Sequence, residues 1–275
     1  MVLLSSIPFI AIGLFALALL FKKRAVGALG WFVFSLYCAS EVSYYLIEKV
    51  EYFDAAIALI FLAFTLLFAA LMLKPASPSD REEEALHFTV TKIALITAAL
   101  YFPFAEFPAL ETLIIALTTR ITVTVLAILG VSVYMVYPSS IYTTASSFHA
   151  VYKPIEIILA CTAIQSMVLF AGLVFGVTAP RNRKLKAFLV SVPTIYVLNI
   201  VRNVFVTAAY FGEWFGPPLQ SFDIGHGIIA RIFVMISLIA VAYAVFVLLP
   251  EALDLIEYFF RYLSRRLTAS IRISG

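Results

Sequence analysis

Three apolar stretches in the last third of the chain contain polar side chains that could take part in covalent chemistry. Cys161 lies in the stretch ACTAIQSM, Arg202 in VLNIVRNVF, and His226 and Arg231 in FDIGHGIIAR. Such groups are costly inside an apolar span, so each needs a reason. A thiol, an imidazole and two guanidinium groups can serve as a nucleophile, a base and anion-stabilising donors, which are the ingredients of acyl transfer.

The context of Cys161 distinguishes it from the second cysteine, Cys38. On a continuous helix Cys161 and Gln165 share a face, with Thr162 and Ser166 on the adjacent stripe. A membrane cysteine without polar neighbours usually acts as a small hydrophobic residue, and we interpret Cys38 in this way. Two isolated cysteines predict neither a disulfide framework nor a metal site, and we expect no cofactor.

The second stretch places three polar residues on one face of a helix: Asn199, Arg202 and Asn203. A guanidinium this far from the nearest loop should have a purpose. One alternative to catalysis is a structural ion pair, for which Glu41 or Glu156 would supply the carboxylate.

The third stretch predicts a helix that begins at Gly227, with His226 at its mouth and Arg231 about one turn deeper. His226 could then belong to the site or could simply cap the helix at the membrane interface. The pattern leaves both readings open.

The composition indicates that membrane helices position these side chains. The chain has 275 residues, of which 63% are hydrophobic and 13% charged. A soluble domain carries about 45–50% apolar and roughly 25% charged residues, so the solvent of this chain must be lipid. The formal net charge is only +3, and the basic residues cluster at the ends of apolar runs. They therefore indicate topology rather than a nucleic-acid surface, and we expect no nucleic-acid partner.

A membrane core of about 30 Å requires about 20 apolar helical residues. About eight segments qualify: residues 3–21, 25–47, 55–73, 90–107, 110–137, 154–177, 185–210 and 227–249. The alternation typical of a barrel is absent. We therefore predict an all-α fold, a polytopic transmembrane helix bundle. The first segment lacks a basic stretch before it and a cleavage signature after it, so it is expected to be retained.

The sequence predicts one integral membrane domain, residues 1–275. It has N-terminal helices (1–153), a three-helix catalytic region (154–249) and an amphipathic cytoplasmic tail (250–275). The tail carries four arginines between apolar residues and resembles a helix lying on an anionic leaflet. Residues 74–87, KPASPSDREEEALH, are predicted to be a solvated loop.

Orientation follows from the basic residues near the span ends. The loop 181–186 and the arginine-rich tail lie two spans apart, so both are expected in the cytoplasm and the connection 212–225 outside. The basic cluster 22–24 disagrees with this orientation, because eight spans would place it outside. Either this short cluster is outweighed by the others, or one predicted crossing is wrong, and the overlong segment 110–137, which contains Arg120, is the first candidate. In this orientation Cys161, Arg202 and the start of the last span lie at a similar depth near the outer surface.

The three stretches resemble the three signature blocks of the exosortase/archaeosortase family, in order, across about residues 154–249, and are most similar to archaeosortase A. The resemblance implies a membrane cysteine transpeptidase that cleaves the C-terminal sorting signal, of Pro-Gly-Phe type, of secreted surface proteins. It would pass them through a thioacyl intermediate to a membrane lipid. Cys161 would be the nucleophile, Arg202 the oxyanion stabiliser, and Arg231 the third catalytic residue. The third residue is usually Arg in archaeosortases and His in exosortases, so His226 is an alternative, with Gln165 and Asn203 in support.

Two other classes remain open from sequence. A transporter or channel could line its path with Glu41, Arg120 and Arg202, but it would predict inverted repeats and helices broken at the midplane, which the sequence does not display. A membrane scaffold would make the clustering of these polar side chains a coincidence.

Overall fold

The computed structural model describes residues 2–73, 81–144 and 152–273, which form helices apart from one small sheet and the connecting turns. The described chain divides into two compact units. Unit 1 comprises Met1–Phe102, Gly172–Ala179 and Glu251–Gly275, and unit 2 comprises Pro103–Ala171 and Pro180–Pro250. The prediction of a helical bundle is confirmed.

Six of the described helices are long and apolar enough to cross a membrane: Arg24–Lys49, Asp54–Leu73, Glu82–Glu106, Pro108–Ile128, Arg181–Phe211 and Pro218–Leu248. Two shorter apolar helices are Ser6–Phe21 and Ile164–Gly176. These helices correspond in order to the eight segments predicted from sequence. The chain is a multi-pass membrane protein.

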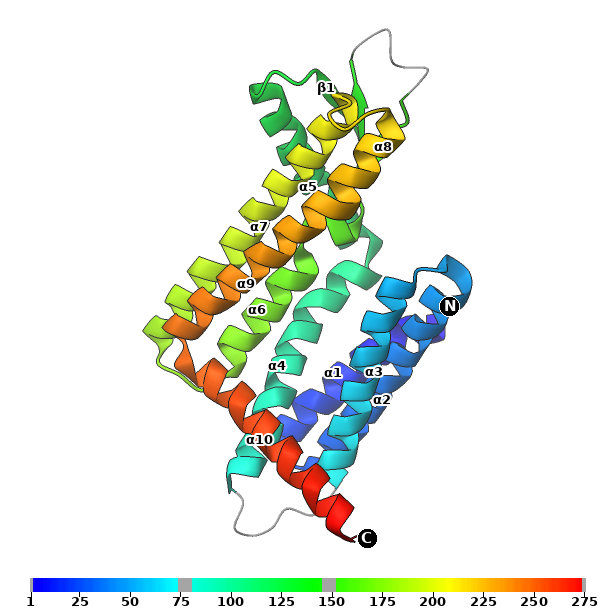
Figure 1. Cartoon of the computed structure of the whole chain (residues 1–275). Helices are drawn as coiled ribbons and strands as arrows, with labels where there is room; N and C mark the ends of the chain where they lie inside the picture. Colours follow the sequence, from blue (N-terminus) through cyan, green and yellow to red (C-terminus); the bar gives the residue numbers. More distant parts are fainter. Residues whose placement is uncertain (1, 74–80, 145–151, 274–275) are drawn as a thin grey trace. The chain divides into compact units, whose positions relative to one another are not determined.

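In unit 1 the three N-terminal helices lie side by side, in blue to cyan in Figure 1: α1 (Val2–Phe21), α2 (Arg24–Ser43, continued by the π-helical turn η1, Tyr44–Lys49) and α3 (Tyr52–Leu73). Their core is aromatic. The rings of Phe15, Trp31 and Phe68 are almost fully buried, with 4.9 Å between the first two ring centroids and 5.1 Å between the last two. Trp31 Nε1 donates to Thr91 Oγ1 at 3.1 Å, which satisfies its buried N–H.

Two small residues bring the second half of α6 (Ile164–Gly176) against α4 (Arg81–Glu106). A Cβ added at Gly172 would lie 1.9 Å from Thr97 Oγ1, and one added at Gly176 would lie 2.2 Å from Ile93 Cγ1. Small residues four apart allow close helix packing, which is how membrane helices associate without a hydrophobic driving force.

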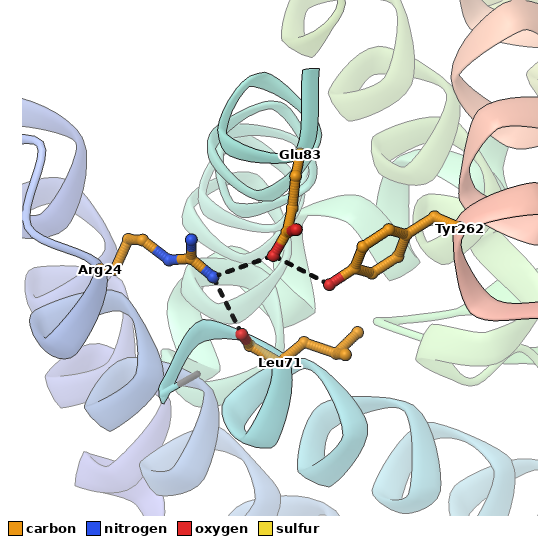
Figure 2. A network of polar contacts seen from close by, with 4 residues as sticks. All are labelled: Arg24, Leu71, Glu83 and Tyr262. Carbon is orange, nitrogen blue, oxygen red and sulfur yellow. Dashed lines mark hydrogen bonds and ion pairs between the residues drawn. The ribbon is translucent and has the colours of Figure 1, made fainter. Parts of the chain in front are cut away.

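A buried polar network joins four segments of unit 1 (Figure 2). Arg24 Nη2 donates to Glu83 Oε1 at 3.3 Å and to the Leu71 carbonyl at 3.0 Å, and Tyr262 Oη donates to Glu83 Oε1 at 2.9 Å. Because Glu83 is 1% exposed, its charge needs these donors.

The network corrects the predicted loop 74–87. Its second part, from Arg81, is the first turns of α4, where Glu83 and His87 are buried. The first part, residues 74–80, lies outside the described residues. The acidic run favoured a loop in the sequence analysis. The partners that allow Glu83 to be buried are 59 and 179 residues away, so no local pattern indicated them.

The C-terminal residues form helix α10 (Pro250–Ile273). Part of its apolar face packs within unit 1 against residues of α3 and α4, through Leu255, Tyr258, Phe259 and Tyr262. The segment predicted to lie at the membrane interface therefore also has a protein partner.

Unit 2 contains the two longest helical segments, which run side by side in yellow-green and orange in Figure 1. One is α7 (Arg181–Phe211). The other is formed by α8 (Pro218–Phe222), the π-helical η3 (Asp223–Ile229) and α9 (Ala230–Leu248). Helix α5 (Pro108–Ile128) packs against α7 through Leu126, Ile200 and Val204.

A three-stranded antiparallel sheet of order β1-β2-β3 follows α5: β1 (Val133–Val136), β2 (Ser140–Thr143) and β3 (Ile155–Glu156). The register pairs Val133 with Thr143 and Ile141 with Ile155. The predicted span 110–137 is therefore wrong at its end, because the helix stops at Ile128 and the β-branched residues after it form strands.

Candidate active site

Cys161 lies on a short 3-10 turn, not within a membrane helix. The backbone is extended at Ile158, turns at η2 (Leu159–Thr162), and then takes a left-handed conformation at Ala163, with φ 59° and ψ 13°. Helix α6 begins only after this residue, at Ile164. A left-handed alanine is strained, which is typical of segments that surrounding structure holds in place for a function.

This turn corrects the prediction of one helix over residues 154–177. Cys161 and Gln165 do not share a helical face, because the left-handed Ala163 separates the turn from α6. Gln165 is exposed in the first turn of α6.

Thr162 fixes the turn to the start of α6. Its hydroxyl donates to the Leu159 carbonyl at 2.7 Å and accepts from the Ile164 N–H at 3.4 Å. Thr162 is fully buried, so these two bonds are not exposed to competition from solvent.

Helix α7 holds the other side of the turn. The side-chain amides of Asn199 and Asn203 both donate to the carbonyl oxygen of Cys161, at 2.7 and 2.9 Å. The two residues are four apart on one helical face, and both are buried. The prediction from sequence included Asn203 in support but assigned no contact to Asn199.

Arg202 continues this network to the third predicted stretch. Its Nη1 donates to Asn203 Oδ1 at 3.3 Å, and its Nη2 lies 3.0 Å from His226 Nε2. A guanidinium can only donate, so His226 accepts at Nε2 and carries its proton at Nδ1. Arg202 forms no ion pair with a carboxylate among the described residues.

His226 lies inside a continuous helical segment, so the prediction of a helix beginning at Gly227 is wrong. The segment starts at Pro218 and passes His226 as the π-helical η3. The imidazole stacks on the ring of Phe222, with the ring centroids 4.9 Å apart and 5° between the planes. Such π-helical turns occur frequently at functional sites because they reorient side chains.

Arg231 follows on the first turn of α9 and is exposed. It lies five residues after His226 on the same helical segment. The structure thus brings all three predicted stretches into one region of unit 2, linked in the order Cys161 carbonyl, Asn203, Arg202 and His226. No hydrogen bond to the Cys161 thiol occurs within the described ranges.

A small cavity adjoins the cysteine turn inside unit 2. It is lined by residues from Ala163 and the start of α6, from α7 and from α9: Ala163, Ser166, Ile195, Leu198, Asn199, Phe233, Val234, Ser237, Leu238 and Val241. Its walls are mainly apolar. Because Asn199 also binds the Cys161 carbonyl, this cavity lies next to the candidate nucleophile.

Two further hydrogen bonds join the segment just before β3 to the end of α7 and the turn after it. Tyr152 is buried and donates its hydroxyl to Glu213, and Tyr210 donates to the Lys153 carbonyl at 3.1 Å. Burial and the neighbouring Glu213 carboxylate raise the pKa of Tyr152 to about 12, because both disfavour the phenolate. The phenol therefore remains a donor at neutral pH. The contact between Tyr152 and Glu213 was not predicted from sequence, because the two residues are 61 positions apart.

Fold and site together define a polytopic helical membrane protein in which Asn203 links a cysteine turn to an arginine–histidine pair. The family model of the transmembrane exosortases (Exosortase_EpsH) matches residues 5–243. The chain belongs to this family.

Two curated relatives are both described as archaeosortase A. The protein of Haloferax volcanii is 34% identical over 117 residues, which cover 38% of this chain and 39% of the relative. The protein of Natronomonas pharaonis is 27% identical over 190 residues, covering 62% and 60%. The matches therefore span less than two thirds of either relative. No solved structure matches the chain.

Proposed function

We propose that this protein is a membrane-embedded cysteine transpeptidase that processes the C-terminal sorting signals of exported proteins. The observation that carries the proposal is the hydrogen-bonded chain from the Cys161 carbonyl through Asn203 and Arg202 to His226. It links the main chain of the proposed nucleophile to one guanidinium that two hydrogen-bond partners hold in place. Membership of the exosortase family and similarity to two archaeosortases A support the same reaction class.

In the proposed reaction the Cys161 sulfur bonds to the carbonyl carbon of the scissile peptide, and the C–N bond breaks. The thiol proton ends on the departing amine, and a thioacyl enzyme remains. An N–H or O–H group of a membrane lipid then bonds to the acyl carbon through its N or O atom, the C–S bond breaks, and the proton of that group passes to the sulfur to restore the thiol. The substrate tail carries a signal of Pro-Gly-Phe type, as the family resemblance implies.

Arg202, His226 and Arg231 have separate roles in this proposal. Arg202, held by Asn203 and His226, donates to the oxyanion that forms on the attacked carbonyl. His226 positions Arg202, since its Nε2 is already occupied as an acceptor. Arg231 is the third catalytic residue and adds positive charge beside the same region.

The test compares the two cysteines in cells that make a tailed surface protein. Cys161→Ala should abolish removal of the tail, measured as the mass of the substrate's C-terminus, whereas Cys38→Ala should leave processing intact. Cys38 is the matched control because it is a buried membrane cysteine in α2, in the other unit. Continued processing by Cys161→Ala would refute the proposed function.

The reaction is proposed to occur on the extracytoplasmic side, on the basis of the basic residues at 181–186 and in the tail. In a background without native cysteines, Leu219→Cys should react with a membrane-impermeant label in intact cells, and Glu257→Cys should not. Leu219, in the first turn of α8, is 73% exposed, whereas Ser221 in the same helix is buried and unsuitable for labelling. The reverse pattern would move the site to the cytoplasmic side.

A further inference from the structure

The outer edge of β3 presents main-chain groups that β2 does not use. In the sheet order β1-β2-β3, strand β3 is at the edge. The Ile157 N–H donates to the Ser139 carbonyl at 2.9 Å, which makes these two residues a hydrogen-bonded pair. Pairs alternate along antiparallel strands, so the neighbouring pair, Glu156 with Ser140, is not hydrogen-bonded. The N–H and C=O of Glu156 therefore point away from β2.

This edge leads directly to the cysteine turn. The backbone remains extended to Ile158, whose carbonyl accepts the Cys161 N–H at 2.8 Å and so starts the turn. The side chains of Glu156 and Ile158 are both exposed, 57% in the case of Ile158. At about 3.3 Å per residue, three or four residues of an extended peptide lying along this edge would reach from Glu156 to Cys161.

Extended peptides are often bound by addition to a sheet edge, where main-chain bonds give affinity and set the register. A peptide-cleaving site needs such a register, because the scissile carbonyl must lie about 3–3.5 Å from the nucleophile. We propose that the edge of β3 at Glu156 binds the extended recognition segment of the substrate tail as a further strand. This inference rests on the proposed function and names how its site holds the substrate.

Proline at position 156 tests the edge without removing a sheet bond. Glu156→Pro deletes only an N–H that points away from β2, a position at which edge strands tolerate proline. Glu156→Ala is the matched control, since it removes the carboxylate and keeps the N–H. One lost hydrogen bond should slow cleavage of a synthetic tail peptide by roughly two- to tenfold. Glu156→Ala should remain near the wild-type rate at equal enzyme abundance.

The peptide provides a second arm that does not depend on folding of the variant. N-methylation of single amides along the recognition segment should slow cleavage by the wild-type enzyme at alternate residues only, because alternate N–H groups face the edge strand. Equal rates for the proline and alanine variants, or N-methyl effects without alternation, would overturn the inference. Failure of the proposed function would differ, since Cys161→Ala would then still cleave the unmodified peptide.

Discussion

Replacing Asn199 and Asn203, singly and together, tests whether α7 holds the cysteine turn in its reactive position. Both amides donate to the Cys161 carbonyl, so Asn199→Leu leaves that oxygen one donor. The loss of one neutral hydrogen bond corresponds to about 0.5–1.5 kcal/mol, or roughly a two- to tenfold slower reaction. Asn203→Leu should cost more, because it also removes the acceptor of Arg202 Nη1. A bond to a charged group adds about 1.5–3 kcal/mol, for a total of about 2–4.5 kcal/mol.

The double variant gives the sharpest result. It leaves a half-buried carbonyl without side-chain donors, and an unsatisfied acceptor carries a desolvation cost of up to about 1–3 kcal/mol, so its effect should exceed the sum of the single effects. The assay is the ratio of precursor to mature substrate at matched enzyme abundance. Asn182→Leu, an exposed position on the first turn of α7, is the control. Additive effects, or single variants no slower than the control, would refute the reasoning.

Four further predictions concern the site and its surroundings. Arg202→Lys keeps the charge but loses the planar fork of donors. It should reach normal abundance and cleave about a hundred- to thousandfold more slowly, whereas a fully active variant would contradict the oxyanion role. Arg231→Ala should slow cleavage more than His226→Ala, and the reverse order would make the histidine the third catalytic residue. Ala163→Gly should raise the melting temperature in detergent, because relief of about 1–2 kcal/mol of left-handed strain exceeds the entropic cost of glycine, about 0.5–1 kcal/mol; a lower melting temperature would contradict that strain. Tyr152→Phe should lower the melting temperature by a constant amount between pH 7 and 9. The difference should shrink above about pH 10, where the unfolded tyrosine loses its proton and the folded one does not. A difference that stayed constant above about pH 10 would contradict the raised pKa of Tyr152.

The helices could be predicted from sequence because the apolar runs are long and lipid permits little else. The polar residues of the site could be predicted because polar side chains are rare within such apolar runs, and Cys161, Arg202 and His226 stand out there. Their proximity in unit 2 also follows the prediction, since the three stretches occupy consecutive segments near one end of each. Whether these residues perform the proposed chemistry stays a prediction.

The helix predicted over residues 154–177 was wrong about the backbone around Cys161. An apolar run of Ile155, Ile157 and Ile158 fits a helix and a buried strand equally well by periodicity. Its strand character depends on pairing with Ile141, 14 residues earlier, which no local pattern contains. Two local signals favoured the break: β-branched residues after Pro154, and Thr162 ahead of α6, where a hydroxyl residue can cap a helix.

The shortness of α6 has a consequence for the bilayer itself. Its 13 residues rise about 20 Å, whereas the hydrocarbon core is about 30 Å thick. Hydrophobic mismatch of this size is relieved by local thinning of the bilayer, or by neighbouring protein segments that fill the part of the hydrocarbon core that the helix does not span. The cysteine turn directly precedes this short helix, and Asn199 and Asn203 satisfy the carbonyl of its irregular backbone. Because the turn adjoins this short helix, lipid acyl-chain length is expected to influence how far Cys161 lies from water.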